Sequence, residues 1–413
     1  MCRSDAVPRD STPSVQLPPE LWIIVLSQIQ PGPKTPGRDH VIARLDIRQR
    51  KNREHEVLQE ISLTCRSLHD LALPIRFRHV KIHADENKGA KPTELYLRLS
   101  KSEKLRSFVK VASLLVYGKG LPRLPDSAQD IMCGMHNLED LRMRTPFQMT
   151  TPLYSHICSL QSLRHLRITM LRQSGSGSFD IAPISHQLSI RSLSIVYGGT
   201  RVGYGKLPSM GWPPHYAWLI PPWLAPIALS SNIRHLCFPS HAIILPSIGS
   251  SPRAIAAPSP NLITLEVNAP CTTPEWEEFR QFIGLSPLIT NLILNERLES
   301  LDDTELDPLP QKLLPGLRRF EGSLRFAGLV VPGRPVSTLV LSSMLLDEIP
   351  SQFRPLTLST TAIRSINIRS SQSLGFIAMI VGLFPDLEEF HMIVDPTNAQ
   401  VCSPTQPLVP KPV

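Results

Sequence analysis

Long apolar runs are missing from this chain of 413 residues, although 42% of its residues are hydrophobic. No run approaches the roughly 18 apolar residues that a membrane-spanning helix requires. The first sixteen residues are polar, include two prolines and lack the apolar core of a signal peptide. We therefore expect no membrane association and a location in the cytoplasm, the nucleus or both.

Closely spaced cysteine pairs are also missing. The seven cysteines stand far apart, are odd in number and never form a CxxC motif. Disulfide frameworks and structural zinc sites depend on such pairs. His235 and Cys237 share one face of a predicted strand, but no second local pair accompanies them. The sequence therefore predicts reduced thiols, no metal site and no cofactor.

The sequence contains only partial matches to catalytic motifs. The stretch at 203–209, GYGKLPS, has the Gly-Lys pair of a phosphate-binding loop. Thr200 stands where the loop needs its first glycine, and Leu207 replaces the magnesium-binding Ser or Thr. Neighbouring acids such as Asp302 and Asp303 are expected to be solvated. We predict a chain without catalytic residues that acts by binding.

Proline and positive charge are abundant. The 41 prolines are near 10% of the chain, about twice the usual share, so helices must be short. The net charge is +8, and the range 31–106 holds 17 Lys or Arg against 10 Asp or Glu. This basic region suits nuclear import, attraction of an acidic partner, or simple solvation. No aromatic residues interleave with its densest part, 44–53, which argues against stacking on nucleic acid.

Two apolar helices are predicted near the N-terminus. Pro18, Pro19 and Glu20 are a helix start signal, and the next six residues are all apolar. The second helix has a stripe that begins at Leu58, and we expect Pro74 to end it. Two helices can bury only one face of each other. The remaining apolar surface requires another part of the chain or a partner protein.

This segment resembles the F-box, and most closely F-box proteins of fungal type. The motifs that support this resemblance are LPPELWIIVLSQI from residue 17, then the LTCRSL and LALPIRFRHVKI stretches. The resemblance implies docking on the Skp adaptor of a cullin–RING (SCF) ubiquitin ligase. It departs from the family at 31–57, a basic insertion between the two pieces. The implied adaptor-binding residues are Leu17, Pro18, Leu21, Trp22, Ile24, Val25, Ile29, Ile61, Leu63, Cys65, Leu68 and Leu71. The alternative is a helical hairpin that caps a larger domain.

A second regularity, apolar-x-x-apolar-x-apolar, is typical of a short half-buried strand. Starts are separated by 27, 25, 27, 43, 29, 27, 28, 19, 27 and 24 residues, a step typical of leucine-rich repeats. The copies are Val111/Leu114/Val116, Leu138/Leu141/Met143, Leu163/Leu166/Ile168, Ile190/Leu193/Ile195, Ile233/Leu236/Phe238, Leu262/Leu265/Val267, Ile289/Leu292/Leu294, the degraded Leu317/Phe320, Val336/Leu339/Leu341, Ile363/Ile366/Ile368 and Leu387/Phe390/Met392.

These copies resemble the leucine-rich repeats of F-box proteins. The predicted fold is α/β: an all-α hairpin, then an irregular solenoid with parallel strands on its concave side and helices or loops on its convex side. Return helices are expected at 273–285 and 373–384. Most copies lack the usual asparagine beyond the strand, so proline-rich turns are expected at the corners. The alternative is an α/β domain whose strands have similar spacing.

The 43-residue step marks an aromatic and proline-rich insertion at 197–226. Aromatic side chains in a proline-stiffened loop are typical anchors of an interface. The candidate substrate-binding residues are Trp212, Tyr216, Trp218 and Trp223. Alternatively, this loop folds over the solenoid and completes its core.

The predicted organisation has four parts: a disordered segment at 1–16, the F-box-like region at 17–82, the solenoid at 83–396 and a disordered tail at 397–413. The predicted function is substrate recognition in an SCF ligase. Its expected partners are the Skp adaptor with its cullin–RING ligase and an unknown protein substrate. The alternative is a leucine-rich-repeat binding scaffold without a ubiquitin role.

Overall fold

The computed structural model describes two compact units, residues 1–113 with 125–138 and residues 114–124 with 139–413. The predicted segments 1–16, 31–57 and 397–413 lie outside the described residues. Residues described are 18, 21, 22, 25, 60, 61, 63, 66–85, 94–117, 126–145, 151–170, 189–197, 224–228, 230–238, 259–270, 272–295, 306–341, 353–370 and 375–394.

The first unit joins helices to the first strands. Its elements are α3 (Arg66–Phe77), β1 (His79–Asp85), α4 (Glu94–Lys101), α5 (Glu103–Ser107), the start of β2 (Val111–Tyr117) and α6 (Asp126–Cys133). Helix α3 contacts α5 and β1, and α4 contacts α6. Ala72 and Phe77 of α3 are buried, as are Val80 and Ile82 of β1. Helix α3 thus packs its last turns against the beginning of the sheet.

The predicted end of α3 at Pro74 is wrong, because the helix continues to Phe77 with Pro74 inside it. Proline cannot donate to the carbonyl of the residue four positions earlier and crowds that turn. Only three residues follow Pro74 in the helix, and one of them is the buried Phe77. Burial of this ring holds the last turn in place despite the missing hydrogen bond.

The second unit is a ladder of parallel strands. They are β3 (Asp140–Thr145), β4 (His165–Met170), β5 (Ser192–Tyr197), β6 (His235–Phe238), β7 (Thr264–Asn268), β8 (Asn291–Asn295), β9 (Arg319–Gly322), β10 (Thr338–Leu341), β11 (Ser365–Ser370) and β12 (Glu389–Val394). Each pairs in parallel with the next one along the chain. Sequential parallel neighbours are the topology of a solenoid, so the predicted α/β solenoid is confirmed.

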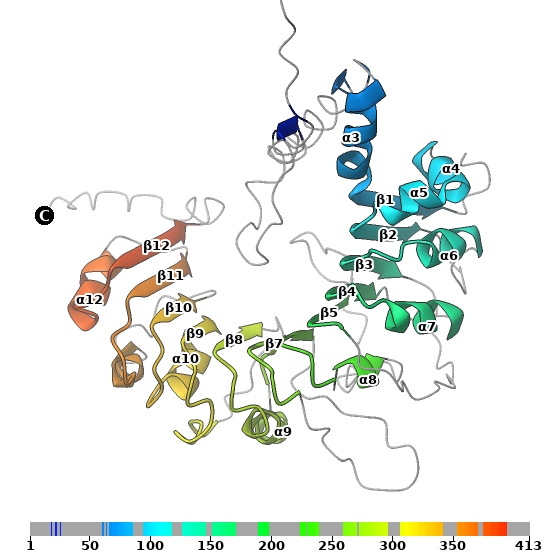
Figure 1. Ribbon diagram of the computed structural model, residues 1–413. Coiled ribbons are helices and arrows are strands. Elements are labelled where there is room, and N and C mark those ends of the chain that lie inside the picture. The colour runs from blue at the N-terminus through cyan, green and yellow to red at the C-terminus, as the bar shows by residue number, and fades with distance from the viewer. Residues whose placement is uncertain are drawn as a thin grey trace, which may run out of the picture. The chain divides into compact units, whose positions relative to one another are not determined.

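Helices fill the returns between these strands. They are α7 (Thr151–Ser159), α8 (Ala225–Ala228), α9 (Thr273–Gly284), α10 (Leu324–Val330), the 3-10 helix η2 (Arg354–Leu358) and α12 (Gly375–Leu383). Within this unit the strands lie on the inner side of the curve and the helices on the outer side (Figure 1). The predicted helices at 273–285 and 373–384 are confirmed as α9 and α12.

The strand register places the repeated apolar positions in rows. Leu141, Leu166, Leu193, Leu236 and Leu265 are successive partners across five strands, and each is at most 1% exposed. Alternate residues of these strands point away from the core, because side chains alternate along a strand. The same backbone therefore builds an apolar core and an outward face of changing composition.

The first predicted copy is shifted by two residues. Val109, Ala112 and Leu114 are fully buried and hold the positions that Leu138, Leu141 and Met143 hold in the next repeat. The small side chain of Ala112 weakens the apolar signal and favoured the wrong frame. A further copy was missed at Phe77, Val80 and Ile82, inside the segment that resembles the F-box.

The degraded copy in β9 has a steric reason. Its third apolar position is Gly322, where an added Cβ would lie 3.0 Å from the Phe320 ring and 3.1 Å from the Leu294 carbonyl oxygen. The Phe320 side chain is fully buried. One large ring therefore fills space that two branched residues share in other copies.

Polar side chains, not prolines alone, satisfy the corners. The single Ser189 hydroxyl is shared between the Leu160 and Leu163 carbonyls, at 2.8 and 2.9 Å. The Asn261 amide reaches the Ser231 carbonyl at 2.8 Å. These bonds link each corner to the previous repeat. They supply donors that proline lacks.

One corner is organised by a buried arginine, Arg334, whose side chain is 0% exposed. Burial lowers its pKa to about 10, so it stays charged at neutral pH. Its guanidinium donates to the main-chain carbonyls of Leu309, Pro310, Leu313, Val330 and Pro332. A single side chain thus connects the segments 309–313 and 330–332, which lie before α10 and at its C-terminal end.

Candidate functional site

The predicted adaptor-binding residues are partly within the described chain. Described members are Pro18, Leu21, Trp22, Val25, Ile61, Leu63, Leu68 and Leu71, whereas Leu17, Ile24, Ile29 and Cys65 lie outside the described residues. A first helical turn is present, since the Leu21 and Trp22 amides donate to the Pro18 carbonyl at 3.0 and 3.3 Å. The start signal at Pro18 therefore marks a helix start, as the sequence indicated.

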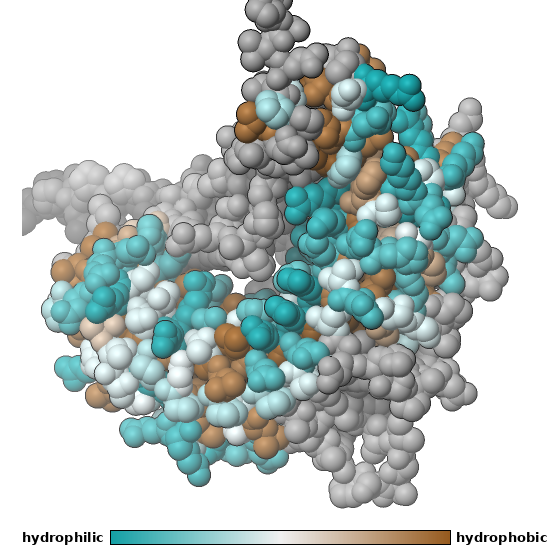
Figure 2. Space-filling model, viewed as in Figure 1, coloured by the Kyte–Doolittle hydropathy of each residue, from teal (hydrophilic) through white to brown (hydrophobic). Residues whose placement is uncertain are grey.

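None of the described members of this set is fully buried. Leu21 and Val25 are each 45% exposed, and Leu63 is 77% exposed. Leu21 and Val25 each have helical backbone, and their spacing of four residues is that of neighbours on one helix face. Figure 2 shows hydrophobic residues at the surface around α3. This part of the first unit exposes apolar side chains that its own described residues do not cover.

The aromatic candidates are not placed. Trp212, Tyr216, Trp218 and Trp223 lie outside the described residues, as does most of the insertion at 197–226. Their role in substrate binding stays a prediction.

A different surface is well described: the outward face of the ladder in the second unit. Its first four strands and the residues just before them hold six arginines, all exposed, against two carboxylates. The arginines are Arg142, Arg144, Arg164, Arg167, Arg191 and Arg234. We call this group the arginine cluster. Sequence reasoning missed it because its members are dispersed over almost a hundred residues.

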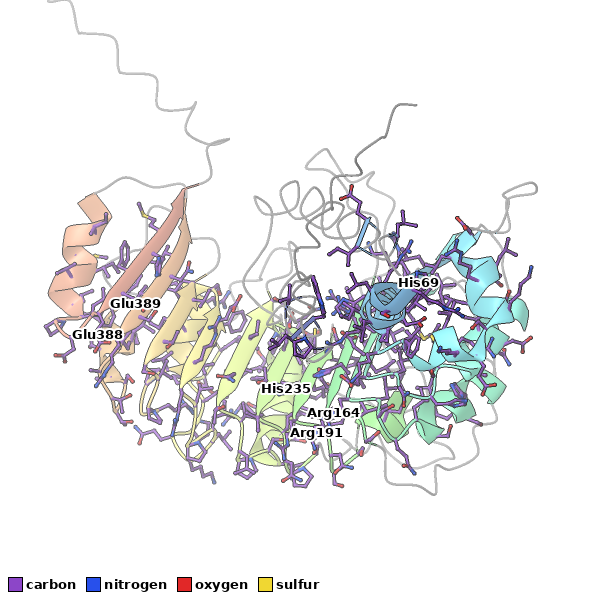
Figure 3. All side chains as sticks on the ribbon, turned by 45° about the horizontal axis from the view of Figure 1, so that its top comes forward. His69, Arg164, Arg191, His235, Glu388 and Glu389 are labelled. Atoms are coloured by element: carbon purple, nitrogen blue, oxygen red, sulfur yellow. The ribbon has the colours of Figure 1, made fainter. Side chains whose placement is uncertain are left out.

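Three members of the arginine cluster form a row. Arg164, Arg191 and Arg234 each stand one residue before a strand, and their backbones are bonded in series. The Arg191 amide donates to the Arg164 carbonyl at 2.8 Å, and the Arg234 amide to the Arg191 carbonyl at 2.8 Å. Figure 3 shows Arg164 and Arg191 close to each other and to His235. Neighbouring strands lie about 4.8 Å apart, so three positive charges are stacked at short range.

Few acids compensate this row. Asp140 pairs with Arg142 at 2.6 Å on the same strand, and Glu139 holds the register position just before Arg164, whose amide donates to the Glu139 carbonyl at 2.9 Å. Among the described residues, no carboxylate forms an ion pair with Arg164, Arg191 or Arg234. Like charges without counter-ions raise the local positive potential and favour an anionic ligand.

His235 lies beside this row and has a lowered pKa. Burial lowers its pKa, and the nearby His165 and Arg234 lower it further. The neutral imidazole is therefore favoured at pH 7. An anion bound beside it would raise the pKa again.

Cys237 lies next to this cluster without any sign of reactivity. Burial, chiefly, and the Glu266 carboxylate raise its pKa to about 12. A thiol with such a pKa is a poor nucleophile and a poor metal ligand at neutral pH. Among the described residues, no group of three His, Cys, Asp or Glu side chains could hold a metal ion.

The face changes character beyond β6. Glu266 of β7 and Glu321 of β9 occupy the register position that Arg142 and Arg167 occupy in β3 and β4. The amides of Asn291 and Asn295 donate to Thr264 and Glu266, at 3.2 and 3.1 Å. The outward surface is thus basic along β3 to β6 and polar to acidic along β7 to β9.

No protein-family model matches the chain, and no curated protein matches it. A search of solved structures finds an internalin from Listeria monocytogenes with 12% identity and a TM-score of 0.31, covering 84% of this chain and 91% of that one. The fold assignment rests on the strand register, not on this likeness. In the described part of the chain, no helix is both long and apolar enough to cross a bilayer.

Proposed function

We propose that this protein is a non-catalytic substrate receptor of an SCF-type ubiquitin ligase. Its N-terminal helical region would bind the Skp adaptor, and the outward face of the solenoid would hold a protein target. Binding in this way raises the effective concentration of target lysines beside the charged ubiquitin-conjugating enzyme.

One observation carries the adaptor part of the proposal: apolar residues at the predicted contact positions are exposed. Leu21 and Val25 share a helix face with 45% exposure each, and Leu63 is 77% exposed. Burying such side chains releases roughly 25 cal/mol per Å² of apolar surface. Covering these side chains with a partner would therefore contribute favourably to the free energy of binding.

A second candidate is a binding scaffold whose N-terminal helix only caps the first repeat. The packing of α3 favours it, because Ala72 and Phe77 are buried and α3 contacts β1 and α5. Solenoids require a cap at each end to protect the terminal core. In the first turns of α3, Arg66, Ser67, His69 and Asp70 are exposed, whereas the predicted contacts Leu68 and Leu71 are half-buried.

Co-purification separates the two candidates. The full chain, co-expressed with an Skp adaptor, should retain it, and Leu21→Asp plus Val25→Asp should abolish retention. The matched control is Leu358→Asp on η2, an apolar residue that is 64% exposed in the second unit. Failure of the wild-type chain to retain any adaptor would leave the scaffold candidate, as would unchanged retention by the double variant.

A further inference from the structure

We infer that the arginine cluster is a docking surface for a short, carboxylate-rich segment of a protein target in extended conformation. This inference deepens the proposed function, because it names the kind of substrate segment that the solenoid would hold. It rests on the exposure of the arginines, their spacing and the change of charge at β7.

Arginine chemistry identifies the ligand class. The guanidinium group presents a rigid fork of donors that matches a carboxylate with two parallel hydrogen bonds. Arg164, Arg191 and Arg234 are exposed, stand in register and have no carboxylate partner among the described residues. Bringing acidic side chains to this row would relieve the repulsion among the three cations.

The spacing limits the length of the segment. Strands β3 to β6 span about 14 Å, because neighbouring strands are about 4.8 Å apart. An extended chain advances about 3.3 Å per residue, so roughly four residues cross this width. Because side chains alternate along an extended chain, a run of four acids would direct about two carboxylates toward the arginine cluster.

The next two strands suit an uncharged continuation of the same segment. Asn291 and Asn295 of β8 each donate one hydrogen bond within the sheet, and a side-chain amide has further donors and acceptors. Such amides can bond to the main chain of an extended peptide. Glu266 stands between the arginine cluster and these amides and would repel additional acids.

The same acids argue against nucleic acid. A long polyanion that ran along the ladder from the arginine cluster would meet Glu266 and Glu321. Single-strand binding also relies on aromatic platforms. Along β3 to β8 the described outward positions hold Arg, His, Ser, Thr, Cys, Asp, Glu, Asn and aliphatic residues, but no aromatic residue. A short acidic peptide therefore fits this surface better than a nucleic acid does.

Fluorescence anisotropy with the full chain tests the inference. The probe is a labelled ten-residue peptide with four consecutive glutamates followed by neutral polar residues. We expect saturable binding that weakens at least 30-fold in the Arg164→Glu, Arg191→Glu, Arg234→Glu variant. The matched control is Arg318→Glu, which changes the same register position outside the arginine cluster and should alter affinity less than twofold.

Three further probes sharpen the outcome. A peptide with glutamines in place of the glutamates should not bind. Binding that appears only with phosphoserines in place of the glutamates would overturn the carboxylate assignment. A 20-nucleotide single-stranded DNA that binds more tightly than the glutamate peptide, and loses affinity in the triple variant, would reassign the surface to nucleic acid.

Two readouts guard against misfolding and against confusion with the adaptor role. The milder Arg164→Gln, Arg191→Gln variant should weaken peptide binding while keeping the wild-type thermal transition, and NMR should show the His235 pKa rising when peptide binds. The triple variant should still retain the Skp adaptor, and the Leu21→Asp plus Val25→Asp variant should still bind peptide. Peptide binding without any adaptor retention would refute the proposed function and leave this inference standing. Equal peptide affinity in wild-type and triple variant would refute the inference alone.

Discussion

The two ends of the ladder in the second unit share one backbone pattern, but several of their arginines differ in whether they pair with a carboxylate. Near β4 to β6, Arg164, Arg191 and Arg234 are exposed and unpaired within the described residues. Near β9 to β12, Arg319 pairs with Glu321 at 3.1 Å, and Arg364 pairs with Glu388 at 3.2 Å. The comparison teaches that the parallel register builds the core, whereas the outward positions vary independently and can serve an external partner.

The buried arginine makes the contrast strongest. Arg334 belongs to the C-terminal half, and its guanidinium donates hydrogen bonds to main-chain carbonyls of the same chain. Arg164 belongs to the N-terminal half, and its side chain is exposed. One arginine is a structural element, while the other is available for binding.

The largest effect is expected for Arg334→Met. The substitution leaves buried carbonyls without their donor, and we expect the free energy of unfolding to fall by about 3–5 kcal/mol. Urea denaturation followed by circular dichroism measures it. Arg318→Met, at an exposed position, is the control and should change stability by about 0.5 kcal/mol or less. A loss below 1 kcal/mol at Arg334 would show that water replaces its hydrogen bonds.

A somewhat smaller effect is expected for core truncations in both halves. Leu166→Ala and Leu292→Ala remove side chains that are 1% and 0% exposed at the same row of the ladder. Each should cost about 2–5 kcal/mol, because the apolar contacts are lost and a cavity remains. Similar shifts of the urea midpoint would show that the halves share one core. A much smaller cost for Leu166→Ala would separate them in stability as well as in charge.

The smallest effect is expected for the coupling free energy between pairs of surface residues, and its sign is the informative quantity. A double-mutant cycle on Arg364 and Glu388, both 64% exposed, should give an attractive coupling of about 0–1 kcal/mol. The same cycle with Arg164→Ala and Arg191→Ala should give a repulsive coupling that weakens as salt is added. Attractive or zero coupling at low salt would contradict the picture of an uncompensated arginine row.

The repeats could be predicted because each copy carries its own apolar signal. Leu163, Leu166 and Ile168 are all buried, and the same positions are buried in the copies on β5 to β8. Two copies depart from the pattern for local reasons. Ala112 gives a weak apolar signal because its side chain is small. At Gly322, the ring of Phe320 occupies the space of the third apolar side chain. Period and hydrophobicity therefore sufficed for most of the solenoid.

The arginine cluster could not be predicted in the same way. Arg164 and Arg191 are separated by 27 residues, and Arg234 follows only after the long insertion. Charged residues at turns usually signify solvation, so one arginine before one strand carries no information. A search for the residue just before every predicted strand would have found the row.

By itself, the sequence determined the solenoid, because a repeated apolar triplet can be buried only by stacking the copies side by side. It also predicts two apolar helices near the N-terminus, of which the structure describes α3. The tertiary structure alone decided which side chains stand next to one another across repeats. Strand pairing brings Arg164, Arg191 and Arg234 into one row, and folding gathers distant carbonyls around Arg334. Charges and hydrogen bonds act over a few ångströms in space, whatever their separation along the chain.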